Sequence, residues 1–201
     1  DDNEERCDEN ELDVSSRTYE DLNLPEVLIS RMYAHQKDGL SWLYRLHLSK
    51  EYSGGILGDD MGLGKTFQTV ALLTGLLRQK QIHNAILLIV PVAVVHSWHR
   101  ELSEHLIPNV SSRVQVHLAT GEVSIPKRHK ILDTVHARAM KGKPAPSIVI
   151  STYTVVSNMI NAFVKCGSCN GGNTTNFGEH TYPNWQWDYV ILDEGHQIKN
   201  P

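Results

Sequence analysis

The chain has 201 residues, enough for one ordinary domain with an arm or an insertion. Hydrophobic residues make up 40% of it, so we expect a packed core rather than global disorder. No apolar run approaches the roughly 20 residues that a membrane-spanning helix needs, and three cysteines, an odd number, argue against a disulfide framework. We therefore expect a globular domain in a reducing compartment, with no membrane partner.

The net charge of −4 arises at the start of the chain. Residues 1–13 hold eight acidic side chains and one arginine. The remaining residues hold 15 of the 23 acidic and 18 of the 19 basic side chains, a net charge of +3. We expect residues 1–17 to form an acidic, flexible tail. The rest of the chain, 18–201, can approach a polyanion such as nucleic acid without strong repulsion.

A predicted helix over 35–50 comes first, with Leu40, Leu43 and Leu46 near one face. After it, short apolar runs alternate with longer amphipathic segments. This alternation predicts an α/β fold, a parallel sheet with helices on both faces in three α/β/α layers, whose ligands bind at the carboxyl ends of the strands. The predicted strands are 55–57, 85–90, 114–118, 148–151 and 189–192, and the predicted helices that follow the first are 65–80, 92–106, 127–140 and 153–165.

Residues 165–184 interrupt this alternation. They are rich in Gly and Asn, which favours a surface insertion. Cys166 and Cys169 have the spacing of metal ligands, but a structural zinc site needs four, so zinc and an ordinary loop both stay open. The chain stops at Pro201, close after a functional motif, and we expect the sheet to be incomplete at the C-terminus.

Residues 58–66 read Gly-Asp-Asp-Met-Gly-Leu-Gly-Lys-Thr, between a predicted strand and a predicted helix. Glycines let backbone N–H groups turn toward an anion, and the start of a helix adds partial positive charge. We expect Lys65 to reach the β- and γ-phosphates of ATP and Thr66 to place its hydroxyl on Mg²⁺. The common phosphate-loop pattern has Gly where this chain has Asp59, so a glycine-rich turn without a ligand is the alternative.

A second motif, Asp193-Glu194-Gly195-His196, ends an apolar strand. We expect Asp193 to hold Mg²⁺ through its water shell and Glu194 to polarise the attacking water. His196 is a candidate for coupling the nucleotide site to a neighbouring element. Solvated acids in a turn are the alternative. Catalysis is favoured because Lys65 and Asp193 both lie at strand ends of one predicted sheet, and phosphoryl transfer needs both.

Together these motifs resemble the first RecA-like lobe of superfamily-two helicase-type motors, in the Swi/Snf translocase branch. Residues 58–66 resemble the motif I of that branch, which accounts for Asp59, although the branch usually has Glu where Asp60 stands. The resemblance runs from about residue 30 to the end, except 165–184, and is closest to the Cockayne-syndrome group B repair translocases. The other matching segments are motif II at 193–200, the Q motif at Gln36, motif Ia at 90–91 and 97–101, and motif Ib at 151–153.

The resemblance implies ATP-driven movement along double-stranded DNA in the nucleus, in chromatin remodelling or DNA repair, against nucleosomes or stalled polymerases. It implies that Gln36 recognises adenine. Ser151 and Thr152 are candidate DNA-phosphate contacts, with helix capping as the alternative, and Trp98 is expected to pack rather than stack on a base. The residues expected around the nucleotide are Asp59, Met61, Gly62, Leu63, Gly64, Lys65 and Thr66.

Members of this branch complete their site with arginines from a second RecA-like lobe. We therefore expect this chain by itself to bind ATP and to hydrolyse it weakly or not at all. The alternative function is a nucleotide-gated DNA- or protein-binding module without turnover. A small phosphotransferase is disfavoured by the Gln36 segment and by the long separation of Lys65 from Asp193.

Overall fold

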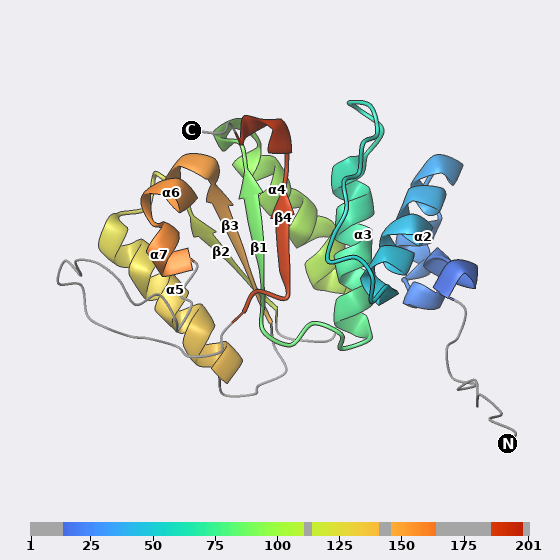
Figure 1. Ribbon diagram of the computed structural model, residues 1–201, viewed down its shortest axis with the longest axis horizontal. Coiled ribbons are helices and arrows are strands. Elements are labelled where there is room, and N and C mark those ends of the chain that lie inside the picture. The colour runs from blue at the N-terminus through green and yellow to red at the C-terminus, as the bar shows by residue number, and fades with distance from the viewer. Residues whose placement is uncertain (1–13, 111–113, 141–145, 164–185, 199–201) are drawn as a thin grey trace, which may run out of the picture. The chain divides into compact units, whose positions relative to one another are not determined.

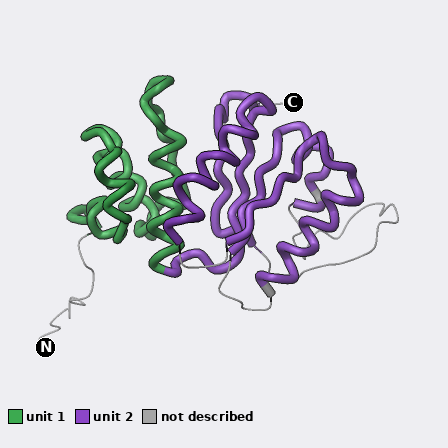
Figure 2. The backbone as a smooth tube through the Cα atoms, turned by 180° about the vertical axis from the view of Figure 1, so that it is seen from behind, with its two compact units in different colours: residues 1–79 green, residues 80–201 purple. Residues whose placement is uncertain are grey.

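The computed structural model describes residues 14–110, 114–140, 146–163 and 186–198 (Figure 1). The chain divides into two compact units, residues 1–79 and residues 80–201 (Figure 2). The acidic residues 1–13, the predicted insertion and both of its cysteines lie outside the described residues. Within the described part of the chain, no helix has the length and apolar character needed to cross a membrane.

The first unit is built from helices. Two short 3-10 helices, η1 (Val14–Ser16) and η2 (Tyr19–Leu22), and a single turn, α1 (Glu26–Ile29), precede the longer α2 (Ala34–Leu48) and α3 (Lys65–Arg78). Helices α2 and α3 pack against each other, and η2 packs against both. The core between them consists of fully buried leucines, namely Leu22, Leu28, Leu40, Leu73 and Leu76.

Residues 54–60 have no regular secondary structure, so the strand predicted at 55–57 is wrong. The segment carries glycines at 54, 55 and 58, and Ile56 is 90% exposed. Glycine loses more conformational freedom on folding than any other residue and offers no side chain to pack, so a short glycine-rich run has little to hold it in a strand. The phosphate loop therefore follows an irregular segment rather than a strand.

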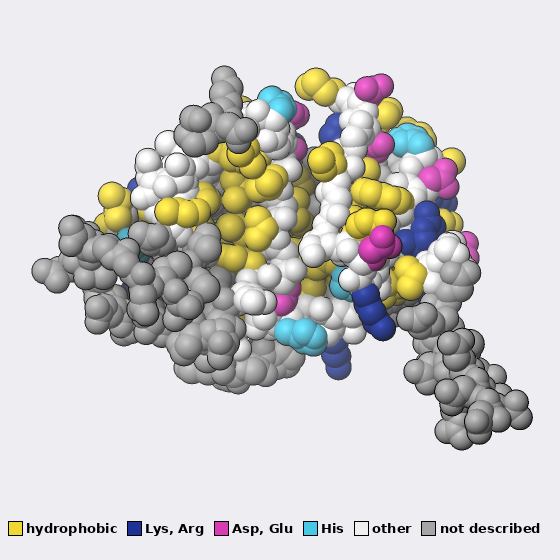
Figure 3. Space-filling view, in the orientation of Figure 1, with side chains coloured by type: hydrophobic (Ala, Val, Ile, Leu, Met, Phe, Trp, Pro, Cys, Tyr) yellow, Lys and Arg dark blue, Asp and Glu magenta, His cyan; other side chains and the backbone are white. Residues whose placement is uncertain are grey.

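The second unit contains a parallel four-stranded sheet, which confirms the α/β fold. Its strands are β1 (Ala85–Val90), β2 (Gln115–Ala119), β3 (Ser147–Thr152) and β4 (Tyr189–Leu192), in the order β2-β3-β1-β4. Every residue of β1 and β3 is buried, which explains why both read as continuous apolar runs. Hydrophobic side chains gather at the surface over β4 (Figure 3), where Val190 is 51% and Leu192 is 43% exposed.

Helices cover both faces of this sheet, as predicted. Helices α5 (Ile125–Met140), α6 (Tyr153–Asn158) and α7 (Ile160–Phe163) lie on one side, and α4 (Val95–Glu101) lies on the other (Figure 1). Leu87, Val149, Leu132 and Phe163 belong to the core on the α5–α7 side. Because side chains alternate along a strand, Ile86, Leu88, Ile148 and Ile150 face the opposite way, toward the α4 side, where Trp98 and Leu102 are buried.

Two predicted helices are interrupted. The segment predicted as one helix over 92–106 is a 3-10 turn η3 (Val92–Val94), α4, a π-helical stretch η4 (Leu102–Leu106) and a final 3-10 turn η5 (Ile107–Asn109). The segment predicted over 153–165 bends at Met159, where φ is −125°, and divides into α6 and α7. The bend lets Val156 of α6 and Phe163 of α7 enter the same core.

Candidate nucleotide site

The phosphate loop turns into α3 through two glycines with positive φ, Gly62 at +88° and Gly64 at +80°. Gly64 is the N-cap of α3, and its left-handed conformation is one that glycine adopts without strain. The first backbone N–H groups of a helix have no partner within the helix, and the helix dipole adds partial positive charge there. The start of this 14-residue helix therefore offers the donors that a phosphate needs.

The ammonium group of Lys65 lies within the loop. Its Nζ donates hydrogen bonds to the carbonyl oxygens of Asp59, at 2.7 Å, and Asp60, at 3.0 Å. The carboxylate of Asp59 accepts a hydrogen bond from Gln68 of α3, at 3.0 Å. Lys65 thus pairs with neutral carbonyl oxygens rather than with a carboxylate, and a phosphate can compete for its charge. These donors fit a nucleotide phosphate.

Gln36 supports the loop from α2. It is 6% exposed, its Oε1 accepts a hydrogen bond from the backbone N–H of Tyr33, and its Nε2 donates to the carbonyl oxygen of Leu63, both at 3.0 Å. A Cβ on Gly64 would collide with the Gln36 amide. Both ends of this amide bind backbone, so the described contacts of Gln36 fix the loop.

A hollow of about 410 Å³ lies beside the loop in the first unit. One wall comes from α2 and the other from the irregular segment before the loop. Its lining combines polar residues with apolar ones. The lining residues are His35, Asp38, Gly39, Trp42, Ile56, Leu57, Gly58 and Asp59.

The other expected loop residues differ in exposure. Met61 is 86% and Leu63 is 39% exposed, so neither packs in a core. Thr66 is half-buried in the first turn of α3. Its position next to Lys65 is the one from which a hydroxyl would serve a cation bound to the phosphates.

In the second unit, Asp193 follows β4 directly and is held by two aromatic side chains. Its backbone N–H donates to the carbonyl oxygen of Ile89, at 3.0 Å, and so continues the pairing with β1. Its carboxylate Oδ2 accepts a 2.7 Å hydrogen bond from the indole Nε1–H of Trp98, and its carbonyl oxygen accepts a 2.7 Å hydrogen bond from the hydroxyl of Tyr153. A carboxylate fixed at the end of a strand is an oxygen ligand of the kind that Mg²⁺ prefers.

Glu194 and His196 contact each other. The Oε2 atom of Glu194 lies 3.2 Å from Nδ1 of His196, whose side chain is 75% exposed. Glu194 has a φ of +52°, which is unusual for a residue with a side chain and lies at the start of the 3-10 turn η6 (Gly195–Gln197). Burial, followed by the charges of Asp193 and Glu194, raises the pKa of the neighbouring Tyr153.

The structure places Ser151 and Thr152 below the surface. Ser151 is fully buried and its hydroxyl donates to the carbonyl oxygen of Ala119, at 2.7 Å, while Thr152 is 3% exposed. Both residues are buried here, and their contact with DNA stays a prediction. Thr152 is the N-cap of α6, but its side chain makes no capping hydrogen bond.

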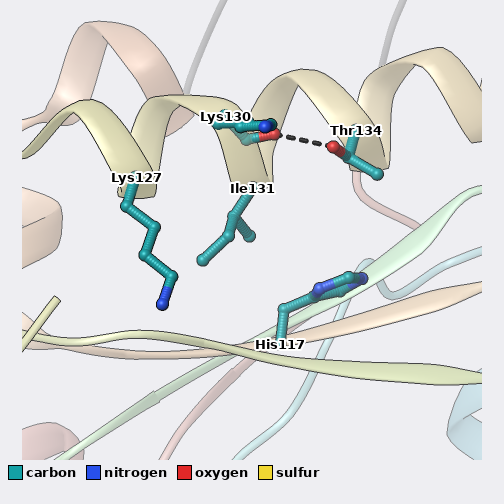
Figure 4. A pocket seen from close by; sticks show the side chains of 5 residues that line it. All are labelled: His117, Lys127, Lys130, Ile131 and Thr134. Atoms are coloured by element: carbon teal, nitrogen blue, oxygen red, sulfur yellow. Dashed lines mark hydrogen bonds between the residues drawn. The ribbon is translucent and has the colours of Figure 1, made fainter.

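A separate hollow of about 400 Å³ lies between β2 and α5 (Figure 4). His117 lines it from β2, and Lys127, Lys130, Ile131 and Thr134 line it from α5. Figure 4 shows the side chain of Lys127 extending from the helix toward the strand. Lys127 and Lys130 belong to the basic stretch 127–130.

Comparison with known proteins places this geometry in a family. Residues 35–201 match the model of the SNF2-related domain. The chain belongs to the SNF2-related domain family. This confirms the predicted Swi/Snf resemblance and the helicase-like ATPase class, and a domain of this class uses ATP.

Several relatives of this SNF2-related domain carry informative names. Protein CHROMATIN REMODELING 24 of Arabidopsis thaliana is 36% identical over 193 residues, which are 94% of this chain and 16% of the plant protein. DNA excision repair protein ERCC-6 of Homo sapiens is 30% identical over 192 residues, 90% of this chain and 11% of the human protein. The chain thus spans less than a fifth of either relative.

A solved structure supports the same fold. The Sulfolobus solfataricus SWI2/SNF2 ATPase core in complex with dsDNA matches 85% of this chain and 27% of that chain, with a TM-score of 0.53 and 25% identity. The neighbour confirms a RecA-like parallel sheet with helices on both faces. The double-stranded DNA is part of the complex described for the Sulfolobus protein.

Sequence reasoning assigned Trp98 to packing and gave Tyr153 no role at Asp193. Trp98 is indeed buried, at 3% exposure, yet its indole N–H also binds the candidate metal ligand. One signal was available in the sequence, because a buried tryptophan usually finds a partner for its N–H. The acceptor of the Trp98 N–H depends on the pairing of β4 with β1, and the sequence does not predict that pairing.

Proposed function

We propose that residues 18–201 are the ATP-binding lobe of a DNA-dependent ATPase that moves along double-stranded DNA in chromatin remodelling or DNA repair. The observation that carries this proposal is the phosphate loop, in which Lys65 and the glycine-capped start of α3 present cationic and N–H donors together. Membership in the SNF2-related domain family and relatives named for both processes support it.

In this proposal Gly62 and Gly64 expose backbone N–H groups to the phosphates, and Lys65 exchanges its carbonyl partners for phosphate oxygens. The adenine occupies the hollow beside α2, near Gln36, which also holds the loop. When bound, Mg²⁺ would neutralise phosphate charge, with Thr66 and Asp193 as its protein partners.

Glu194 is the candidate for orienting the attacking water. His196, which contacts Glu194, is the candidate for coupling the nucleotide site to a neighbouring element. A second RecA-like lobe would supply the arginines that complete catalysis. Nucleosomes or stalled polymerases are the proposed targets, and the nucleus is the proposed location. The names of two relatives, one for chromatin remodelling and one for DNA excision repair, support a target in chromatin or in DNA repair and, with it, the nuclear location.

The test of the phosphate loop is calorimetric titration of the chain with Mg²⁺ and ATPγS, a slowly hydrolysed analogue. We expect Lys65→Ala to weaken binding by about tenfold or more, because it removes charge-assisted hydrogen bonds worth about 1.5–3 kcal/mol. Lys50→Ala, at an exposed site after α2, is the matched control and should bind as the unchanged chain does. Equal affinity of the Lys65 and Lys50 variants would refute the assignment.

Glu194→Gln separates binding from chemistry in the same titration. The substitution keeps the shape and removes the charge, so nucleotide affinity should stay within about twofold if Glu194 acts on water rather than on the nucleotide. A collapse of affinity would instead make Glu194 a binding residue. Binding of duplex DNA that changes with ATPγS but without any turnover would favour the alternative, a nucleotide-gated binding module.

A further inference from the structure

We propose that Trp98 and Tyr153 are positioning residues for the metal-binding carboxylate of Asp193: Trp98 holds the carboxylate and Tyr153 holds the backbone. This inference rests on the proposed function, since it assigns a role to two neighbours of the proposed Mg²⁺ ligand. It adds two residues to a site that the sequence motifs describe only through their acidic pair.

The bond from Trp98 has a fixed direction and a favourable length. An indole nitrogen can only donate, so Oδ2 of Asp193 must accept. The 2.7 Å separation is short, as expected where a neutral N–H meets a carboxylate. With Oδ2 held in this way, the carboxylate cannot rotate about its Cβ–Cγ bond without losing the hydrogen bond.

Trp98 is itself immobilised by packing. It is 3% exposed and lies on α4, between Val95 of the same helix and Leu102 of η4, which are both buried. An indole ring wedged in a core has little rotamer freedom, since native cores are close-packed. The position of Oδ2 is therefore determined by the α4 layer and not only by the turn after β4.

Tyr153 binds Asp193 from α6, on the other face of the sheet. Its hydroxyl donates to the carbonyl oxygen of Asp193, at 2.7 Å, while its ring packs against the core on the α5–α7 side of the sheet. Asp193 is thus anchored from both helical layers, by α4 and by α6 (Figure 1).

Outer-shell hydrogen bonds of this kind orient a metal ligand and raise its effective affinity, and their loss typically costs 10–100-fold in metal binding. If Trp98 served packing alone, replacing its indole by another aromatic ring would leave Mg²⁺ binding unchanged. The two roles are therefore separable by a substitution that removes the N–H and keeps an aromatic ring.

The experiment compares Trp98→Phe and Tyr153→Phe with a matched control, Trp187→Phe. Trp187 also lies in the second unit and also donates an indole hydrogen bond, to the carbonyl oxygen of Phe163 at 2.9 Å, but it does not contact Asp193. The readout is the Mg²⁺ concentration that gives half-maximal binding of a fluorescent ATP analogue to the whole chain. Thermal unfolding of each variant monitors folding.

We expect Trp98→Phe to raise the half-maximal Mg²⁺ concentration by about tenfold and to leave binding of metal-free nucleotide within about twofold. Tyr153→Phe should shift it in the same direction by a smaller factor, because it frees the backbone and not the carboxylate. Trp187→Phe should leave it unchanged. A Mg²⁺ midpoint that is the same for Trp98→Phe and Trp187→Phe would overturn the inference while the proposed nucleotide site stands.

A second measurement follows the bond itself and does not need bound nucleotide. With ¹⁵N-labelled tryptophan, the chain gives indole N–H signals from its four tryptophans, and each is assigned by its Phe variant. We expect Asp193→Asn to move the Trp98 signal and to leave the Trp187 signal in place. An unmoved Trp98 signal would overturn the inference even if Trp98→Phe unfolds, whereas absence of any Mg²⁺-dependent nucleotide binding in the unchanged chain would overturn the proposed function.

Discussion

Gly62 and Gly64 both have positive φ in the phosphate loop, yet their surroundings differ. A Cβ on Gly62 would meet nothing within 4 Å, whereas a Cβ on Gly64 would collide with the amide of Gln36. Gly58, just before the loop, has open space around it and no positive φ. The three glycines therefore form a graded series in which backbone strain and steric collision can be separated.

We expect Gly64→Ala to destabilise the chain and to weaken nucleotide binding more than Gly62→Ala does. Both variants incur roughly 1–2 kcal/mol of left-handed strain, but only Gly64→Ala also displaces Gln36 from the Leu63 carbonyl. Gly58→Ala is the control and should be close to neutral. Urea unfolding and ATPγS titration of the three variants measure this, and equal effects at 62 and 64 would contradict the role given to Gln36.

His117 makes stability depend on pH. Burial, and then the positive charge of Arg138, lower its pKa below the ordinary value of 6.5. The unfolded chain therefore takes up a proton at this site at a higher pH than the folded chain, so the contribution of neutral His117 is present above about pH 6.5 and is lost as the pH falls through the lower, folded-state pKa. Lys127 and Lys130 line the same hollow and add no acidic partner.

We expect His117→Gln to reduce the loss of stability on acidification. The measurement is the urea midpoint at pH 7.5 and pH 5.5, and the matched control is His83→Gln at an exposed position. The control should lose as much stability between pH 7.5 and pH 5.5 as the unchanged chain does. If both variants lose stability on acidification as steeply as the unchanged chain, His117 is not the group responsible.

At the scale of elements, β4 is joined to β1 by few residues. Strand β4 has only Tyr189–Leu192, and alternate side chains on it are exposed. Its entry is held by Asp188, whose Oδ2 accepts hydrogen bonds from the backbone N–H groups of His83 and Asn84, both at 2.6 Å. These bonds cross 105 and 104 positions of sequence, so they align the starts of two strands that no local signal relates.

We expect Asp188→Ala to lower the free energy of unfolding by about 1–3 kcal/mol, because two backbone donors lose their acceptor. Glu122→Ala, in an exposed turn of the same unit, is the control for removing a carboxylate. Urea denaturation at pH 7.5 compares the two variants. Identical midpoints would show that water replaces Asp188 without cost.

At the scale of the whole molecule, the two motifs belong to different compact units. The phosphate loop and Gln36 belong to residues 1–79, whereas Asp193, Glu194 and His196 belong to residues 80–201. Nucleotide affinity is therefore predicted to depend mainly on the first unit and metal dependence on the second. The proposed second lobe adds a further requirement, that of the arginines for turnover.

We accordingly expect the chain to bind ATP but to hydrolyse it very slowly, with no more than about twofold stimulation by duplex DNA, since positioned arginines contribute roughly 10³–10⁵ to related phosphoryl transfers. Phosphate release, with and without duplex DNA at low salt, is the measurement. Glu194→Gln provides the background rate. Rapid, DNA-stimulated hydrolysis by the chain alone would show that the site is complete without a second lobe.

The sequence by itself determined the family, the parallel sheet and the two motifs. These depend on local patterns, namely apolar runs bounded by polar strand ends and a glycine-lysine-threonine turn at the start of a helix. Four of the five predicted strands are present, and the fifth, at 55–57, is absent because its glycine-rich residues gain nothing from burial in this structure.

Only the tertiary structure decided what surrounds the motif residues. The acceptor of the Trp98 indole, the burial of Ser151 and the hold of Gln36 on Leu63 all depend on contacts between segments distant in sequence. A hydrogen bond across 95 positions exists because β4 pairs beside β1 and α4 packs on their face, and the residue types involved allow many other partners. The motifs therefore indicate the candidate reactive residues, while strand order and packing decide which other side chains position those residues.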